Sequence, residues 1–328
     1  MNDITTSIFR ITNDSEFEKY ALDVFYYQAE NNKVYKEYLN IRKIISRNIK
    51  HISAIPFLPI SFYKNHEVTT KPENTEIIFC SSGTTGENIS KHFVHDINLY
   101  RESFLTGFRK YYGNVEDYCI LALLPSYLER DDSSLVFMVK ELINKSKCSD
   151  SNFFLNNYGE LSDILKKNIN SSKKVLLLGV SFALLDFAEK FPLALSENII
   201  VMETGGMKGR RKEITREELH SFLCKQFQKN NIHSEYGMTE LLSQAYSHEN
   251  GLYQYPPWMR VVIRDLYDPY SVLENGKAGG INVIDLANCY SCSFIETQDI
   301  GKLNSNGSFE VLGRLEGSQL RGCNLLVE

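Results

Sequence analysis

The sequence predicts an α/β protein in which layered sheets are covered by helices and a small β-rich lobe follows at the C-terminal end. Three observations lead to this prediction. Short apolar runs alternate with segments of helical periodicity up to about residue 250, as is typical of a sheet covered on both faces. From about Tyr253 the pattern changes to short strands separated by turns. A length of 328 residues accommodates two such parts, 1–250 and 251–328.

Local sequence patterns predict the helices and strands of the first part. Residues 15–47 place apolar side chains at helical spacing, and Ser15 with Glu18 has the pattern of a capping box. Pro56 and Pro59 then exclude a helix, because proline lacks the backbone donor that a helix needs. Strands are expected over 76–80 and 119–124, and the apolar run 175–178 predicts a strand followed by a helix up to Phe191.

The remaining elements complete the predicted α/β body and the lobe. A strand over 199–202 is followed by two glycines, and a helix over 215–228 begins with a second capping-box pattern, Thr215 with Glu218. In the C-terminal part, turn-forming sequences at 274–277 and 304–307 separate the expected strands. These strands are expected over 261–264, 280–284, 294–297 and 309–312.

Composition and charge exclude several classes of protein. The chain carries 36 Lys and Arg against 41 Asp and Glu, a net charge of −5, whereas a dedicated nucleic-acid-binding protein usually has a basic excess. No signal peptide is evident, and the longest apolar stretch, over 175–188, is too short and interrupted to span a membrane. Seven cysteines favour free thiols in a reducing compartment. We therefore expect a cytoplasmic globular protein with no nucleic-acid partner and no membrane span.

The first motif that indicates chemistry follows the strand expected over 76–80. Its glycines allow the backbone to form a nest of N–H groups, and its four hydroxyls add donors, which together suit a polyphosphate. No Gly-Lys-Ser/Thr follows, so it is not a Walker P-loop, and a polar surface turn is the alternative. The first motif consists of Ser81, Ser82, Gly83, Thr84, Thr85 and Gly86.

The second motif gathers a ring, a flexible glycine, a hydroxyl and a carboxylate within a short stretch. Such a set could stack on a base, reach a phosphate and hold Mg²⁺ through oxygen, although the start of an ordinary helix would also fit. The second motif consists of Tyr236, Gly237, Met238, Thr239 and Glu240.

The third motif is an acidic turn followed by a Gly-Arg pair. Asp299 follows the strand expected over 294–297, where an acidic residue can accept both hydroxyls of a ribose. Gly313 and Arg314 come shortly afterwards. An Asp-Ile-Gly turn carries little information by itself, so this motif gains meaning only from its order relative to the other two.

The order and spacing of the three motifs resemble the adenylate-forming superfamily, which includes acyl-CoA synthetases, peptide-synthetase adenylation domains and firefly luciferase. The resemblance covers roughly residues 55–323 and implies the N-terminal domain of these enzymes as the fold. Three longer segments resemble the acyl-protein synthetase (LuxE-like) family, whose enzyme activates fatty acid for the fatty-acid reductase of luminous bacteria. They are ETGGMKGRRKEITREEL at 203–219, YPPWMRVVIRD at 255–265 and GRLEGSQLRGCNLL at 313–326.

The resemblance assigns nucleotide-binding roles to the first motif and to the glycines after the strand over 199–202. The first motif would hold the ATP phosphates, with Thr84 and Thr85 as its main side-chain donors. Gly205 and Gly206 would let the backbone approach the adenine, and Tyr236 would stack on that ring.

The resemblance also assigns roles around the reacting phosphate and the ribose. Thr239 would touch the α-phosphate, and Glu240 would hold Mg²⁺. Asp299 would bind the ribose with Arg314 nearby, and Gly237 and Met238 would belong to the same nucleotide-binding stretch.

One departure from the superfamily concerns the cation that assists adenylation. Most members continue past the Gly-Arg pair as a mobile C-terminal domain that supplies a lysine, whereas fourteen residues follow Arg314 in this sequence. We therefore expect another cation to stabilise the charge that develops at the α-phosphate. Lys208, Arg210, Arg211 and Lys212 are candidates, as are Lys91 and Arg321. A solvated basic surface before the next helix is the alternative for residues 208–212.

Cys323 matches the cysteine that the acyl-protein synthetase family acylates. The resemblance implies an enzyme that uses ATP and Mg²⁺ to convert a carboxylic acid, expected to be a fatty acid, into acyl-AMP. Cys323 would then take the acyl group as a thioester and deliver it to a partner reductase. A thiol is only a few per cent thiolate at neutral pH, so Arg321 could assist by lowering its pKa. A small buried residue is the alternative for Cys323.

Two other functions remain open. The acyl acceptor could be coenzyme A or a carrier protein, or the chain could be a non-catalytic nucleotide-binding subunit. The departure at the C-terminal lysine favours the non-catalytic subunit, whereas the presence of Glu240 argues against it.

Some histidines and cysteines of the sequence have no assigned role. His92 and His95 could contact phosphate or lie on a surface helix. Cys289 and Cys292 form a CxxC pair without the second half of a zinc site.

Overall fold

The computed structural model describes residues 2–81, 89–125, 131–205, 211–212 and 214–315. The chain forms two compact units. We call residues 1–104, 238–243 and 254–328 the flanking unit, and residues 105–237 and 244–253 the central unit. Residues 1–104 thus share a unit with most of the segment 251–328, whose role as a separate lobe stays a prediction.

The central unit is built on a mostly parallel sheet with the strand order β5-β4-β6-β7-β8-β9. Neighbouring strands from β5 to β8 run parallel, and β9 runs antiparallel to β8. Every residue of β4 is buried, which agrees with a continuous apolar run covered on both faces. The strands are β4 (Tyr118–Leu123), β5 (Asn152–Phe154), β6 (Lys174–Val180), β7 (Ile199–Thr204), β8 (His233–Tyr236) and β9 (Ala245–Ser247).

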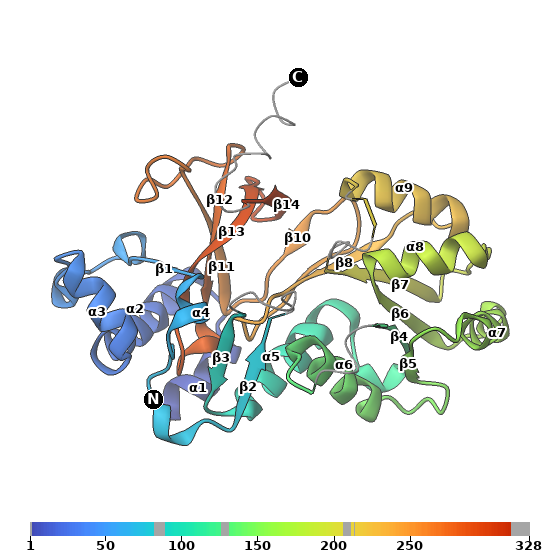
Figure 1. The fold of residues 1–328 in the computed structure, drawn as a ribbon, viewed down its shortest axis with the longest axis horizontal. Coiled ribbons are helices and arrows are strands. Elements are labelled where there is room, and N and C mark those ends of the chain that lie inside the picture. Colours follow the sequence, from blue (N-terminus) through green and yellow to red (C-terminus); the bar gives the residue numbers. More distant parts are fainter. Residues whose placement is uncertain (1, 82–88, 126–130, 206–210, 213, 316–328) are drawn as a thin grey trace. The chain divides into compact units, whose positions relative to one another are not determined.

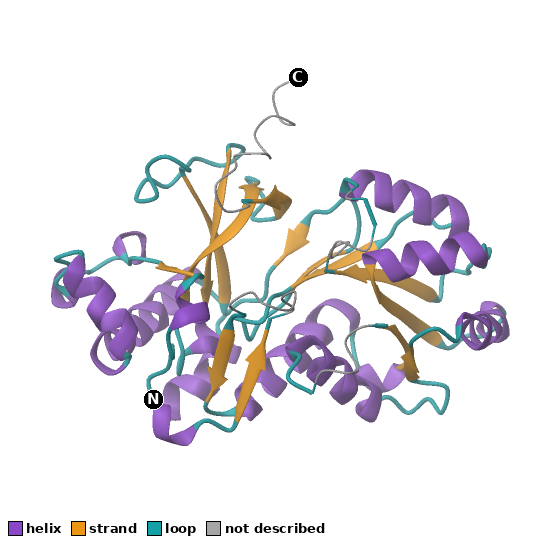
Figure 2. Ribbon diagram, viewed as in Figure 1, coloured by secondary structure: helices purple, strands orange, loops and turns teal. Residues whose placement is uncertain are grey.

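Helices cover both faces of the central sheet. In Figure 1, α8 and α9 lie over one face and α6 lies over the other, and Figure 2 shows the same layers by type of element. The capping box predicted at Thr215 and Glu218 is confirmed at the start of α9. The helices are α6 (Ser134–Lys145), α7 (Tyr158–Ile169), α8 (Ser181–Lys190) and α9 (Arg216–Phe227), and α5 (Ile97–Tyr112) crosses from the flanking into the central unit.

The flanking unit contains an antiparallel sheet and a separate hairpin. Its sheet has the order β11-β12-β13-β14, with β1 parallel to β13, and β2 pairs with β3 in the hairpin. The hairpin strands are β2 (Ile77–Cys80) and β3 (Lys91–Val94). The sheet strands are β1 (Leu58–Pro59), β11 (Met259–Arg264), β12 (Ala278–Asp285), β13 (Phe294–Leu303) and β14 (Phe309–Arg314), while β10 (Tyr253–Gln254) lies at the unit boundary.

The single helix predicted over 15–47 is wrong, because the chain forms two helices there. They are α2 (Asp14–Asn31) and α3 (Lys33–Ile41), preceded by α1 (Asn2–Ser7) and followed later by the short α4 (Phe62–Asn65). Asn32 takes an extended backbone conformation between the two helices, and its side chain accepts from the N–H of Tyr35. The predicted capping box at Ser15 is also wrong, since Asn13 is the N-cap and accepts from the N–H of Glu16 at 3.0 Å.

Among the described residues, no helix has both the length and the apolarity that crossing a membrane requires. The described cysteines are all free thiols: Cys80, Cys119, Cys148, Cys224, Cys289 and Cys292.

Candidate functional site

Part of the predicted site lies outside the described residues. This applies to most of the first motif, to one of the two glycines after β7, to three of the candidate cations and to the predicted acyl acceptor. The residues concerned are Ser82, Gly83, Thr84, Thr85, Gly86, Gly206, Lys208, Arg210, Arg321 and Cys323.

In the flanking unit, the hairpin strands hold both ends of the stretch that contains the first motif. The N–H of Ser81 donates to the carbonyl of Ser90 at 3.0 Å, and the N–H of Ser90 donates to the hydroxyl of Ser81 at 2.9 Å. Because β2 and β3 are paired in register next to these residues, the two ends are fixed side by side.

Residues 238–243, which include the end of the second motif, are held by the carboxylate of Asp285. Asp285 lies at the end of β12 and is fully buried. Its Oδ2 accepts from the N–H groups of Leu242 at 2.8 Å and Ser243 at 3.0 Å, and its Oδ1 accepts from the hydroxyl of Ser243 at 2.6 Å. The indole N–H of Trp258 lies 2.9 Å from the same hydroxyl. These contacts fix the chain directly after Glu240.

Glu240 itself is only 5% exposed. Burial raises the pKa of its carboxyl, whereas a hydrogen bond from Ser90 and the positive charge of Arg314 favour the carboxylate, and the charge of Asp299 opposes it. Within the flanking unit, the charged residues of the third motif therefore affect the pKa of the carboxyl of the second motif.

The surroundings of Glu240 fit the predicted role in holding Mg²⁺. A buried carboxylate with Asp299 close enough to affect it supplies the anionic oxygens that this ion needs, and Mg²⁺ commonly takes its other ligands from water and phosphate. Within the described part of the chain, no group of three or more His, Cys, Asp or Glu could hold a metal by itself.

The predicted ribose-binding pair is brought together by strand pairing. Asp299 on β13 lies directly opposite Arg314 on β14. The Nε of Arg314 is 4.0 Å from Oδ1 of Asp299, and the side chains are 68% and 17% exposed respectively. The Asp299 carboxylate is thus mostly sheltered, while the Arg314 guanidinium is open to solvent.

In the central unit, the first two residues of the second motif end strand β8. The ring of Tyr236 packs against that of Tyr253 with centroids 5.9 Å apart, and Tyr236 is 8% exposed. A Cβ at Gly237 would lie 2.5 Å from Oε1 of Glu235, so a larger residue there would displace the Glu235 carboxyl.

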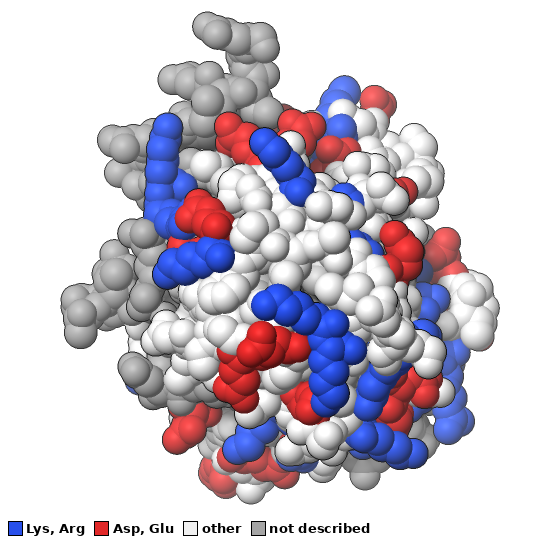
Figure 3. Space-filling view, turned by 90° about the vertical axis from the view of Figure 1, so that its right-hand side faces the viewer, with Lys and Arg blue, Asp and Glu red and all other residues white. Residues whose placement is uncertain are grey.

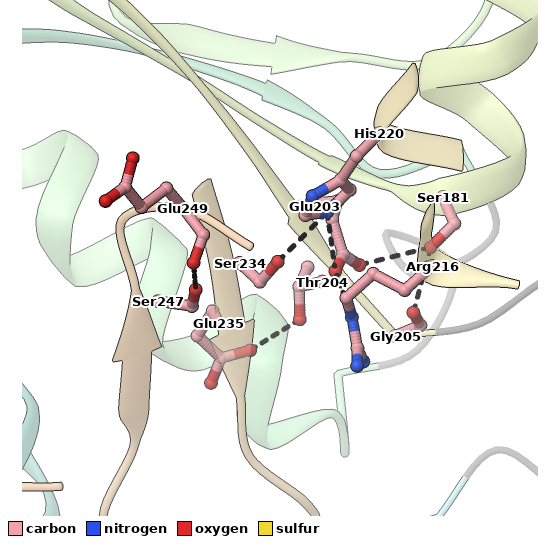
Figure 4. Close-up of polar contacts among 10 residues, drawn as sticks. All are labelled: Ser181, Glu203, Thr204, Gly205, Arg216, His220, Ser234, Glu235, Ser247 and Glu249. Carbon is pink, nitrogen blue, oxygen red and sulfur yellow. Dashed lines mark hydrogen bonds and ion pairs between the residues drawn. The ribbon is translucent and has the colours of Figure 1, made fainter. Parts of the chain in front are cut away.

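A buried ionic cluster, drawn in Figure 4, supports the turn at Gly205. Glu203 on β7 is 2% exposed and lies 3.2 Å from the Arg216 guanidinium and 3.6 Å from the His220 ring. Burial works against the charged carboxylate, but these neighbours outweigh it and lower the pKa of Glu203. The hydroxyl of Ser181 lies 2.9 Å from the carbonyl oxygen of Gly205, whose φ of +69° favours glycine.

A second carboxyl, that of Glu235, lies one residue before Tyr236. It is 7% exposed and accepts a hydrogen bond from the Thr204 hydroxyl at 2.5 Å. The pKa of Glu235 is raised to about 7, chiefly by burial and also by the nearby charge of Glu203, while the hydrogen bond from the Thr204 hydroxyl opposes the shift.

Arg211, one of the candidate cations, is engaged in ion pairs with helix α8. Its guanidinium contacts Asp186 and donates to both carboxylate oxygens of Glu189, at 2.9 and 2.6 Å. On the face shown in Figure 3, basic and acidic side chains are likewise interspersed rather than separated into one basic area. A role for Arg211 at a phosphate would therefore require it to leave two carboxylates.

The histidines after the first motif do not lie on a surface helix. His92 is on β3 and fully buried between the carbonyl of Thr239 and the side chain of Asn288, while His95 follows the strand and contacts the carbonyl of Asn74 at 2.7 Å. The expectation of a surface helix is wrong because the chain returns as the second strand of a hairpin.

Sequence reasoning missed Asn288 and Asp285, which hold the segment after Gly237. Both lie at the short 3₁₀ helix Leu286–Asn288, more than 40 residues along the chain from the groups they contact. It also missed the roles of Glu203 and His220, although Glu203 stands two residues before Gly205 and begins the family segment at 203–219. No local spacing signals such partners, because each becomes a neighbour only through the sheet.

Comparison with known proteins identifies a family. Residues 10–328 match the family model described as acyl-protein synthetase, LuxE. A search of curated proteins returned no match.

Solved structures share the fold. The chain is similar to 2-hydroxyisobutyryl-CoA ligase in complex with 2-HIB-AMP, with a TM-score of 0.68, 9% identity, and coverage of 95% of this chain and 71% of the ligase. For ATP-bound MatB from Rhodopseudomonas palustris the TM-score is 0.56 at 15% identity, covering 76% and 49%. For O-succinylbenzoate coenzyme A synthetase from Bacillus subtilis with AMP it is 0.50 at 19%, covering 73% and 49%. The chain spans about half the length of the MatB structure, and these similarities confirm the predicted α/β fold class.

Proposed function

The chain belongs to the LuxE acyl-protein synthetase family, and on that premise we propose that it activates a carboxylic acid with ATP and then acylates itself. In the first step a carboxylate oxygen attacks the α-phosphorus of ATP, the bond to the β,γ-phosphates breaks, and acyl-AMP and pyrophosphate form. In the second step the thiolate of Cys323 attacks the acyl carbonyl, AMP leaves with the electron pair of the broken bond, and a thioester remains.

One geometric observation supports this proposal more than any other. In the flanking unit, the charges of Asp299 and Arg314 affect the pKa of Glu240. These residues come from two motifs about 60 residues apart in the sequence. A buried carboxylate is costly unless a cation or hydrogen-bond donors compensate it. A nucleotide and its metal ion would supply that compensation at this position.

The residues have separate roles in the proposed reaction. Glu240 holds Mg²⁺, which when bound would offset charge on the phosphates. The Thr239 hydroxyl donates a hydrogen bond to the α-phosphate. The Asp299 carboxylate, near Arg314, accepts hydrogen bonds from the ribose hydroxyls. Tyr236 stacks on the adenine. The first motif, from Ser81 to Gly86, surrounds the phosphates with N–H groups and hydroxyls.

The finer features of the proposal rest on the family. The acid is a fatty acid, the acyl group passes from Cys323 to a partner reductase that reduces it to an aldehyde, and the reaction takes place in the cytoplasm. Lys208 and Arg210 are proposed to stabilise the transition-state charge, together with Arg211 once it is released from α8.

Intact-protein mass spectrometry tests the proposal directly. The protein is incubated with Mg-ATP and a panel of carboxylic acids, and then treated with hydroxylamine, which cleaves thioesters. We expect a mass increase equal to one acyl group for the correct acid, lost after hydroxylamine and absent in Cys323→Ala. The matched control Cys224→Ala, on α9, keeps the adduct.

A second measurement separates the two half-reactions. ATP–pyrophosphate exchange reports acyl-AMP formation alone, so Cys323→Ala is expected to retain it at the wild-type rate. An adduct that persists in Cys323→Ala would show that Cys323 is not the acceptor.

The structural neighbours favour one other acceptor. One of them is named a CoA ligase and another a coenzyme A synthetase, and the structure of 2-hydroxyisobutyryl-CoA ligase is also known in complex with 2-HIB-AMP and CoA. Pyrophosphate release that requires coenzyme A, with no protein adduct, would therefore assign this chain to the same first step with coenzyme A as the acceptor.

A further inference from the structure

The ring of His92 lies completely buried between two groups of the flanking unit. Its Nδ1 is 2.8 Å from the carbonyl oxygen of Thr239, and its Nε2 is 2.9 Å from Oδ1 of Asn288. Thr239 belongs to the second motif, so a histidine on the hairpin strand β3 directly contacts the main chain of that motif. The neighbouring ring of Tyr63 stands edge-on to it, with centroids 5.7 Å apart.

Asn288 holds the next residue of the motif. Its Nδ2 donates to the carbonyl oxygen of Glu240 at 2.7 Å. A carbonyl oxygen can only accept, so this contact fixes the orientation of the amide and turns Oδ1 toward His92. His92 and Asn288 together therefore hold the carbonyl groups of two consecutive residues, Thr239 and Glu240.

The carbonyl oxygen of Thr239 and Oδ1 of Asn288 are both acceptors, so a neutral ring with a single N–H can donate to only one of them. A hydrogen bond to Thr239 requires the hydrogen on Nδ1, and the 2.9 Å contact of Nε2 with Asn288 is then a close approach rather than a hydrogen bond. Burial lowers the pKa of His92 to about 4, although Thr239 and Asn288 both raise it, and the ring is neutral at pH 7. The other titratable groups of the elements around it, Tyr63, Glu240 and Asp285, are themselves buried with raised pKa values.

The rest of the segment is held by a different group. Asp285 accepts from the N–H groups of Leu242 and Ser243, which follow Glu240. The carboxylate of Asp285 thus fixes the far end of the segment and leaves the carbonyl groups of Thr239 and Glu240 to His92 and Asn288.

We propose that His92 and Asn288 are positioning residues, which hold the main chain of Thr239 and Glu240 so that their side chains face the reacting phosphate and its metal ion. This inference rests on the proposed function for its catalytic consequence, but the hold itself can be measured without any reaction. Neither residue touches the nucleotide in this role.

Paired variants test the role. His92→Leu removes both contacts, whereas His92→Asn places an amide N–H near the position of Nδ1 and keeps the donor to Thr239. We expect His92→Leu to lower kcat for ATP–pyrophosphate exchange about 100-fold with little change in the KM for ATP, since small misplacements of reacting groups cost this much. His92→Asn should restore most of the loss. His51→Asn, at an exposed histidine, is the matched control.

Hydrogen exchange measures the hold independently of activity. In His92→Leu, and likewise in Asn288→Leu, the peptide covering residues 238–243 should exchange about tenfold faster, while the hairpin and the strands β11–β14 keep wild-type rates. In ¹⁵N-histidine spectra of the wild type, the His92 ring should carry its proton on Nδ1.

Several outcomes would overturn the inference. Faster exchange throughout the flanking unit, or no rescue by His92→Asn, would assign His92 a packing role only. A ring protonated on Nε2 alone would remove the hydrogen bond to Thr239, and a locally released segment with unchanged kcat would remove the catalytic consequence. If the wild type exchanges no pyrophosphate with any acid, the proposed function fails, and the exchange and ring-nitrogen results still decide whether the hold exists.

Discussion

The carboxyl of Glu240 is the one acidic group of the second motif, and it is buried. With 5% exposure and a raised pKa, it gains a proton more readily than a surface glutamate would. Glu240→Gln removes the charge and keeps the shape. We expect ATP–pyrophosphate exchange to fall by about 100- to 1000-fold, the range for removal of one electrostatic stabiliser of a transition state.

The folded state of this variant should be at least as stable as that of the wild type, because an amide costs less to bury than a carboxylate. Thermal unfolding monitored by circular dichroism checks this expectation. Glu274→Gln, at a side chain that is 86% exposed, serves as the control. Retention of full exchange activity by Glu240→Gln would contradict the metal-holding role.

Glu235 gives the central unit a predictable dependence on pH. Its pKa is about 7 in the folded protein against 4.5 normally, so the folded state binds the proton more tightly. The stability that this group contributes is complete below pH 4.5 and is lost as the pH rises through 7. At pH 8, Glu235→Gln should therefore unfold at a higher urea concentration than the wild type. Its free energy of unfolding should be greater by up to about 3 kcal/mol.

The difference between Glu235→Gln and the wild type should shrink toward zero as the pH is lowered to 4.5. Urea unfolding at several pH values measures it, and Glu249→Gln, at an exposed side chain, should show no such trend. A constant difference across the pH range would mean that the ionisation of Glu235 does not respond to folding.

At the scale of elements, the cap of helix α2 gives different roles to two residues that stand two positions apart, Asn13 and Ser15. Asn13 accepts from the N–H of Glu16, whereas Ser15 lies inside the helix. Asn13→Ala should lower the free energy of unfolding by about 1 kcal/mol, and Ser15→Ala should change it by less than about 0.5 kcal/mol. Urea unfolding at pH 7 compares the two; an equal loss in both variants would contradict the observed cap.

The sequence allowed prediction of those elements whose signals are local. The apolar runs that form β4, β6 and β7 and the capping box of α9 lie within a few neighbouring residues, and each was placed correctly. The break at Asn32 was not predicted, because the side chain that caps α3 also donates to the carbonyl of Ser291, far along the chain.

The same limit applies to the candidate site. The family pattern predicted that Arg314 lies near Asp299, and the two residues do lie opposite each other on paired strands. The burial of His92 could not be predicted, because it depends on Asn288, 196 residues later. Residues of the motifs leave a sequence pattern, whereas the residues that hold them in place need only meet in the folded chain.

For the whole molecule, the cysteines should differ sharply in reactivity. Burial raises the pKa of both Cys289 and Cys292 to about 12, and both are fully buried. Because the thiolate is the reactive form, iodoacetamide at pH 7.5 should label them at least about 100-fold more slowly than half-buried Cys224 on α9. Peptide mass spectrometry of timed reactions measures this; rapid labelling of the native protein at Cys289 would contradict the buried position.

The division of the second motif between the two units has a practical meaning for anyone who cuts or recombines the gene. Tyr236 and Gly237 belong to the central unit, and the next six residues belong to the flanking unit. A fragment that stops at residue 250 would contain residues 238–243 but not Asp285 or Asn288, which hold them. Exchange of one contiguous segment between relatives would therefore transplant half of a motif without its supports, and chimeras should move residues 238–243 together with residues 254–315.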